Sequence, residues 1–142
     1  MKRILAKIVD TSTGMPQTDW GLLFLRVMVG SFMLFGHGWG KLTGYVERMA
    51  AFPDPLGVSS PVSMTLVVFA EFFCSIFIFL GFGTRLAALV LLINMLVAGG
   101  IIHSDDPWGK KELAFMYAIA YATILIAGAG RFSLDRKFFK TT

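Results

Sequence analysis

The sequence predicts an all-α protein: a four-helix transmembrane bundle with both termini in the cytoplasm. Three observations support this fold class, namely the composition, four long apolar runs, and the placement of the basic residues. Of the 142 residues, 56% are hydrophobic and only 15% are charged, whereas about 25% is usual for soluble domains. The mean hydropathy is +0.70. This composition excludes a disordered chain, a coiled coil and a disulfide scaffold, and it argues against an ordinary soluble enzyme.

The four apolar runs are each long enough to cross a bilayer as a helix, about 20 residues at 1.5 Å per residue. We expect them at about residues 20–39, 62–82, 86–102 and 113–129. The first run starts only at Trp20, and no small-residue cleavage pattern follows it, so it is interpreted as a retained span and not a signal peptide. Three prolines within residues 52–61 exclude a helix there.

The basic residues predict the orientation of the bundle. With four spans, both termini share one side, which carries eight Lys and Arg residues against four on the other side. The positive-inside rule therefore places both termini in the cytoplasm of a multi-pass inner-membrane protein. We expect a polar cytoplasmic segment at 1–19, a membrane domain at 20–131, and a basic cytoplasmic tail at 132–142. The net charge of +4 is thus explained by topology, and no nucleic-acid partner is predicted.

Several polar residues lie inside the predicted spans, where a charged group is costly. Three of them are Arg26 in the first span, Glu71 near the middle of the second, and Asn94 near the middle of the third. Their depths predict that Arg26 and Glu71 form a pair. One interpretation is that the three residues only hold helices together. Another is a ligand or proton site in the bundle interior, and a third is that Arg26 extends its side chain to the interface.

The first helix adds a polar stripe, because Arg26, Gly30, His37 and Lys41 fall within about 80° of one another on a helical projection. Alternating glycines around His37 allow close approach of another helix or a flat ligand. The predicted ligand-binding residues are Arg26, His37, Lys41, Glu71, Asn94, Tyr117 and Tyr121. An outer rim is predicted at His103, Asp105 and Glu112, with Asp106 beside them. The spacing of the histidines does not match a metal motif, so no metal site is predicted.

The order of these features resembles the DoxX family of small four-helix membrane proteins. The matching segments are LLFLRVMVGSFMLFGHGWGKL, the Pro-rich loop, AEFFCSIFIFLGFGTRLAAL and GAGRFSLD, which together cover about residues 20–136. The family is named for a subunit of an archaeal thiosulfate:quinone oxidoreductase. The resemblance implies a redox-linked membrane protein, with Arg26, Glu71 and His37 as the positions to carry over.

The favoured hypothesis is a redox-linked, quinone-associated membrane subunit with an interior polar site at Arg26, Glu71 and His37. A partner redox subunit or a homo-oligomer would then be needed, because the chain has no Cys pair, haem motif, dinucleotide fingerprint or P-loop. For the same reason, it stays open whether the chain is itself an enzyme. The alternatives are a non-catalytic membrane scaffold or assembly factor, and a small transporter or channel protomer.

Overall fold

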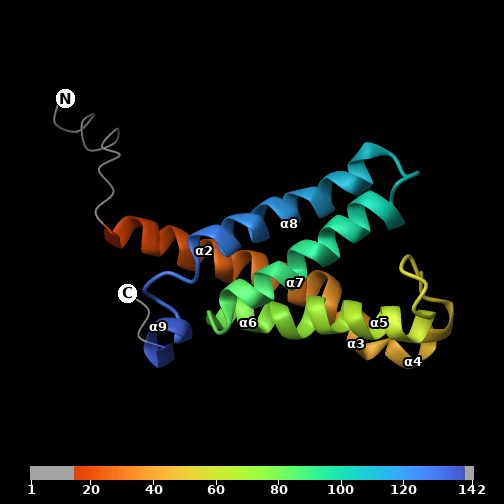
Figure 1. The fold of residues 1–142 in the computed structure, drawn as a ribbon, viewed down its shortest axis with the longest axis horizontal. Coiled ribbons are helices and arrows are strands. Elements are labelled where there is room, and N and C mark those ends of the chain that lie inside the picture. Colours follow the sequence, from red (N-terminus) through yellow and green to blue (C-terminus); the bar gives the residue numbers. More distant parts are fainter. Residues whose placement is uncertain (1–14, 140–142) are drawn as a thin grey trace.

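The computed structural model describes residues 15–139, and every regular element in that range is a helix (Figure 1). Three elements are π-helical (η1, η3 and η4) and one is 3₁₀ (η2). In chain order the elements are α2 (Met15–Met33), η1 (Leu34–Gly38), α3 (Trp39–Thr43), α4 (Tyr45–Arg48), η2 (Met49–Ala51), α5 (Ser60–Val68), η3 (Phe69–Cys74), α6 (Ser75–Leu80), α7 (Thr84–Val97), η4 (Ala98–Ile102), α8 (Trp108–Ala127) and α9 (Leu134–Phe139). This confirms the all-α prediction.

Consecutive elements join into four long helical stretches, three of which are long and apolar enough to cross a membrane. These three are Gln17–Thr43, Ser60–Leu80 and Thr84–Ile102. The fourth stretch, α8, has 20 residues, but three charged residues, 110–112, stand close to its beginning. Residues 15–139 thus contain three candidate spans, and a fourth crossing by α8 stays a prediction.

The helices differ from the predicted runs mainly at their ends. The first begins at Met15, ahead of Trp20, and α8 begins at Trp108, because helical backbone extends into polar residues that hydropathy assigns to loops. The backbone continues through the glycines near His37 as η1 and α3 to Thr43, although glycine is a weak helix former. The Pro-rich segment is non-helical over residues 52–59, as predicted. Its last two residues, Ser60 and Pro61, instead begin α5, because proline is tolerated in the first turn of a helix.

Small residues allow the helices to pack closely. The α7–α8 pair, which has the most extensive contact in the bundle, buries Ala87, Ala88, Ala114 and Ala118. Many large apolar side chains point outward, and Ile126, for example, is 79% exposed. An apolar exterior with small residues at a close helix–helix contact is typical of proteins in a bilayer.

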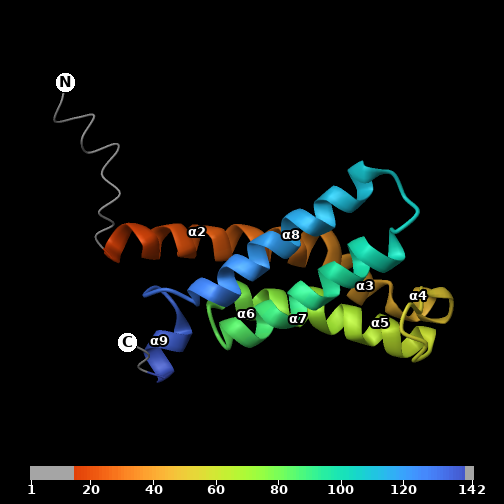
Figure 2. The ribbon, with the colours of Figure 1, turned by 45° about the horizontal axis from the view of Figure 1, so that its top comes forward.

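The two ends of the bundle are built differently. Figure 2 shows that α9 lies at the same end as the beginning of α2, whereas α3, α4 and the segments at 52–59 and 103–107 lie at the opposite end. We call these the α9 end and the α4 end. Most of the predicted N-terminal segment, residues 1–14, and residues 140–142 of the predicted tail lie outside the described part of the chain.

At the α9 end, the C-terminal segment caps a helix that is distant in sequence. The carboxylate of Asp135 accepts hydrogen bonds from the backbone N–H groups of Gly83 (2.6 Å) and Thr84 (2.9 Å) at the start of α7. The N–H of Asp135 donates in turn to the carbonyl of Gly81 at 2.8 Å. An acidic residue at a helix N-terminus satisfies otherwise unpaired N–H groups and the positive end of the helix dipole.

Removing this cap should destabilise the protein. We expect Asp135→Ala to lower the free energy of unfolding by about 1–2 kcal/mol, the usual cost of losing an N-cap. Thermal unfolding in detergent measures the change. Asp105→Ala is the matched control, since Asp105 is exposed in a loop and should change stability by no more than about 0.5 kcal/mol. Equal effects of the two substitutions would contradict the capping role.

Candidate functional site

Glu71 is the centre of a polar cluster that joins three helices. It lies in η3 with its side chain 5% exposed. One carboxylate oxygen, Oε2, pairs with the ammonium group of Lys41 in α3. The other, Oε1, accepts a hydrogen bond from the amide nitrogen of Asn94 in α7 at 3.1 Å. The buried carboxylate is therefore both neutralised and hydrogen-bonded, which is the condition for tolerating a charge in the membrane interior.

A cavity of about 130 Å³ lies beside this cluster. Its inner wall includes the buried side chains of Met33 and Met95. It is lined by side chains of the three candidate spans, of α8 and of the 103–107 connection. The lining residues are Met33, His37, Lys41, Glu71, Met95, Ala98, His103, Lys110, Leu113, Ala114 and Tyr117.

Three π-helical segments border the cavity, one in each candidate span. Each contributes a lining residue: His37 from η1, Glu71 from η3, and Ala98 from η4. A π-helical turn holds more residues than an α-helical turn, so it rotates the following residues to a different face of the helix. Such segments occur often at functional sites. Their convergence on one cavity marks this region as the candidate site.

Close approach of two backbones positions Lys41 opposite Glu71. Gly38, in η1, packs directly on η3, and a Cβ atom at that position would lie 2.6 Å from the carbonyl carbon of Glu71 and 2.9 Å from the Cα of Phe72. Only glycine fits at this contact. By contrast, a Cβ at Gly36 or Gly40 would meet no atom within 4 Å. Of the three alternating glycines, Gly38 alone is required for close packing.

An aromatic wall completes the site on α8. The rings of His37 and Tyr117 meet edge to face, with centroids 5.8 Å apart and an interplanar angle of 88°. Tyr121 stacks on Tyr117 at 6.1 Å and is fully buried. Tyr117 lines the cavity and Tyr121 does not. The predicted tyrosine pair therefore divides into one residue at the cavity and one that supports it from behind.

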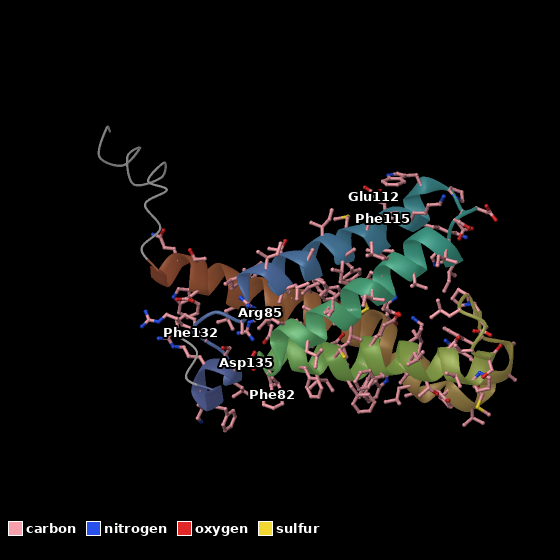
Figure 3. The ribbon with its side chains drawn as sticks, in the orientation of Figure 1. Phe82, Arg85, Glu112, Phe115, Phe132 and Asp135 are labelled. Carbon is pink, nitrogen blue, oxygen red and sulfur yellow. The ribbon has the colours of Figure 1, made fainter. Side chains whose placement is uncertain are left out.

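The rim of the cavity is formed by a small charged network at the α4 end. His103 Nδ1 lies 2.6 Å from Asp106 Oδ2, and the ammonium group of Lys110 lies 3.5 Å from Asp106 Oδ1. Asp105 and Glu112 are exposed and do not line the cavity. Figure 3 shows Glu112 on α8, toward the α4 end. Within residues 15–139, no three His, Cys, Asp or Glu side chains gather closely enough to hold a metal ion.

Sequence reasoning missed Lys110 as a site residue, since it served only to predict orientation. The available signal was its spacing: it follows Asp106 by four residues and His103 by seven, which places the three on one side if the chain turns helically there. Met33 and Met95 were also missed, because nothing in an apolar run distinguishes a cavity wall from a packed core.

The predicted Arg26–Glu71 pair is wrong. Arg26 is 1% exposed, but its Nη1 donates to the carbonyl of Ile78 at 3.3 Å and its Nη2 donates to the carbonyl of Phe132. The prediction compared only the depths of Arg26 and Glu71 in the membrane. The actual partner of Glu71 is Lys41, which lies about 22 Å beyond Arg26 along the same helical stretch at 1.5 Å per residue. The carbonyls at the end of α6 carry the negative end of the helix dipole, which attracts the guanidinium group.

Arg26 is consequently separated from the other predicted site residues. The structure brings His37, Lys41, Glu71 and Tyr117 to the cavity, and it connects Asn94 to them through Glu71. Arg26 instead ties α2 to α6 and to the C-terminal segment at the α9 end.

The rim network makes a testable contribution to acid stability. The hydrogen bond from His103, aided by the charge of Lys110, lowers the pKa of the Asp106 carboxyl. A carboxyl whose pKa is lower in the folded state stabilises that state above the unfolded pKa of about 3.9, and the contribution disappears as the pH falls through the folded pKa. We expect Asp106→Asn to lower the melting temperature at neutral pH, with the difference from wild type closing below about pH 4. Asp105→Asn should follow the wild type throughout, and a difference that does not change with pH would contradict this assignment.

The fold and site together define a class: a multi-pass membrane protein whose helical bundle holds a small cavity near one end, lined by both charged and apolar side chains. Similarity to known proteins identifies the family within this class. The DoxX family profile matches residues 21–104. The chain is 30% identical to "Inner membrane protein YqjF" of Escherichia coli K12 over 122 residues, covering 83% of this chain and 92% of that protein. It is 32% identical to an uncharacterized protein of Haemophilus influenzae over 126 residues, covering 84% and 91% of the two chains.

The chain belongs to the DoxX family and is a multi-pass protein of the inner membrane. The family match covers Arg26, the Glu71 cluster and His103, and it ends before Lys110 and Tyr117. No solved structure matches the chain significantly.

Proposed function

We propose that this protein is a redox-linked membrane subunit that binds the head of a quinone-like molecule in the cavity beside Glu71. The observation that carries the proposal is the convergence of Lys41, His37 and Tyr117 around one cavity in the bundle. A few polar groups converging on a concave site near the membrane are typical of a ligand site. Interhelical packing alone needs the Lys41–Glu71–Asn94 cluster but does not need a cavity.

The size of the cavity limits the ligand. Drug-sized ligands occupy pockets of about 300–1,000 Å³, whereas this cavity measures about 130 Å³. An engineered protein cavity of about 150 Å³ holds one benzene ring. The polar head bound here would therefore be a single six-membered ring carrying oxygen acceptors, and a fused two-ring head would not fit without widening the cavity.

The donors present suit such a head. The ammonium of Lys41, the imidazole of His37 and the hydroxyl of Tyr117 are able to donate to carbonyl oxygens on a flat ring. Histidine exchanges protons near neutral pH, so His37 would release or take up the proton that accompanies reduction or oxidation. Glu71 holds Lys41 in place. A bound quinone would supply the electron-carrying chemistry, and a partner redox subunit or a second copy would exchange electrons with it.

The same proposal includes the membrane topology. We infer that α8 is a fourth span, because it has the length of a bilayer crossing and packs along α7. Both termini would then lie in the cytoplasm, as the excess of basic residues at the α9 end favours.

The test is quinone content and binding of the purified protein. Wild-type protein in mild detergent should retain or bind a short-chain benzoquinone. Glu71→Gln, which releases Lys41, should weaken binding by about tenfold, the effect of losing one charge-assisted hydrogen bond. Asp105→Asn, outside the cavity, is the control and should bind as wild type. A wild-type protein that neither contains nor binds a benzoquinone would overturn the quinone proposal.

A second candidate, a non-catalytic scaffold or assembly factor, is favoured by a different observation. Both oxygens of Glu71 have partners inside the protein, so the cluster is complete without a ligand. Under this hypothesis, Lys41→Met combined with Glu71→Leu should fold and should still copurify with its partner proteins. Loss of those partners from a well-folded double variant would reject the scaffold.

A further inference from the structure

The α9 end of the bundle carries a concentration of exposed positive charge. In the described part of the chain, four cationic side chains are exposed there, on the first turn of α7, on the segment after α8, and on α9: Arg85, Arg131, Arg136 and Lys137. Figure 3 shows Arg85, Phe132 and Asp135 gathered at this end. The α4 end differs, since its exposed cations are interspersed with Glu47, Asp54, Asp105 and Glu112.

Within residues 15–139, the two carboxylates of the α9 end, those of Asp19 and Asp135, face the protein. Asp19 is 9% exposed and accepts a hydrogen bond from the backbone N–H of Arg131 at 2.7 Å. Asp135 is engaged with the start of α7, as described above. Their oxygens are thus occupied by backbone groups, and the closest ion pair is a long one, 3.9 Å from Arg131 Nε to Asp19 Oδ2. Among the described residues, the charged groups that this end presents to its surroundings are therefore mainly guanidinium and ammonium groups.

The segment that carries the positive surface is held in place by contacts with the bundle. Arg26 binds the carbonyl of Phe132 from inside the bundle. Asp135 is fixed at both its side chain and its N–H, through Gly83, Thr84 and Gly81. These contacts orient α9 against the ends of α6 and α7. A fixed array of cations binds an anionic partner with less loss of conformational entropy than a flexible tail does.

Exposed aromatic side chains accompany the cations. Trp20 is 59% exposed, Phe132 43% and Phe138 63%, and the Trp20 and Phe132 rings lie 4.5 Å apart. Aromatic residues beside basic ones are typical of the level of lipid headgroups. We propose that the α9 end is a binding site for anionic phospholipids, with the cations contacting the phosphodiester groups and the aromatic rings entering the headgroup layer. This site is separate from the cavity and does not depend on what the cavity binds.

The test uses charge-matched variants at the two ends of the bundle. Arg136→Gln with Lys137→Gln removes two cations from the α9 end, and Arg48→Gln with Lys111→Gln removes two from the α4 end. Full-length protein in neutral detergent is mixed with phosphatidylglycerol or phosphatidylethanolamine, and bound lipids are counted by native mass spectrometry. We expect the α9-end variant to lose phosphatidylglycerol binding by about thirtyfold, because two cations are removed. The α4-end variant should bind as wild type, and Arg136→Lys with Lys137→Arg should preserve binding.

Several outcomes would overturn the proposal. Equal retention by both double variants would show that the α9 end is not the site, and equal loss would show a response to net charge only. Equal binding of phosphatidylglycerol and phosphatidylethanolamine by the wild type would remove the requirement for a negative headgroup. Full displacement of the lipid by soluble glycerol phosphate would assign the site to free phosphate. Thermal unfolding of each variant verifies that a loss of binding does not reflect a loss of fold.

Discussion

Lys41→Met is expected to be among the most destabilising single substitutions in this protein. It leaves the Glu71 carboxylate, whose side chain is 5% exposed, with Asn94 as its remaining partner. Breaking a buried ion pair by removing one partner costs about 3–5 kcal/mol, and thermal unfolding in detergent should report a change of this size.

Replacing the other partner of the pair, Glu71, should lower the free energy of unfolding by less. Glu71→Leu leaves Lys41 unpaired, but the Lys41 side chain is 24% exposed, and its flexible stem allows the ammonium to reach water. The double variant, Lys41→Met with Glu71→Leu, should recover most of the stability, because replacing both partners of a buried pair by apolar residues is often neutral. A double variant as unstable as the sum of the two single variants would contradict a direct pairing.

The same double variant separates stability from function. If the Lys41–Glu71 pair serves only packing, then the apolar replacement should preserve every activity of the protein. If Lys41 also donates to a ligand in the cavity, as we propose, then the double variant should fold well and bind benzoquinone poorly. Measuring unfolding and binding on one preparation therefore distinguishes the two candidate functions.

Gly38→Ala is the second substitution with a large expected effect. The added Cβ would meet backbone atoms of Glu71 and Phe72, which cannot move aside as a flexible side chain could. We expect a loss of about 1–3 kcal/mol from overpacking. Because η1 would shift away from η3, His37 and Lys41 should also move relative to Glu71, and ligand binding should weaken.

Two neighbouring glycines provide controls within the same helix. A Cβ at Gly36 or Gly40 meets no atom within 4 Å, and alanine is favoured over glycine in a helix by about 0.5–1 kcal/mol. Gly36→Ala and Gly40→Ala should therefore leave stability unchanged or raise it slightly. Similar melting temperatures for all three variants would show that the η1–η3 contact does not limit packing.

The sequence identified most of the polar residues that meet at the cavity but paired them incorrectly. Glu71, His37 and Lys41 were recognisable because polar groups in apolar runs are costly and so need partners. The pairing of Arg26 with Glu71 was predicted from their depths in the membrane, and those depths assume straight helices. Hydrogen bonds from Arg26 to backbone carbonyls could not be predicted, since carbonyl groups occur at every residue and leave no signal in the side-chain pattern.

The π-helical segments explain why the rest of the site could not be predicted from the sequence. A helical projection at a constant angle per residue predicts which side chains share a face. Each π-helical turn changes that angle locally, and no residue type marks where it does so. His37, Glu71 and Ala98 reach one cavity through three such changes, which depend on packing between helices that are distant in sequence.

The helical class, the membrane environment and the apolar runs were predictable from the sequence. They follow from composition and hydropathy, which reflect the free energy of transferring each residue into lipid and need no knowledge of neighbours. The family was indicated separately, by the resemblance of particular segments such as the one from Leu22 to Leu42. Only the tertiary structure decided that Glu71 pairs with Lys41, that Arg26 and Asp135 secure the C-terminal segment, and that a cavity lies beside Glu71. Each of these depends on the distance between atoms of different helices, and that distance is set by packing, at contacts such as the one between Gly38 and η3.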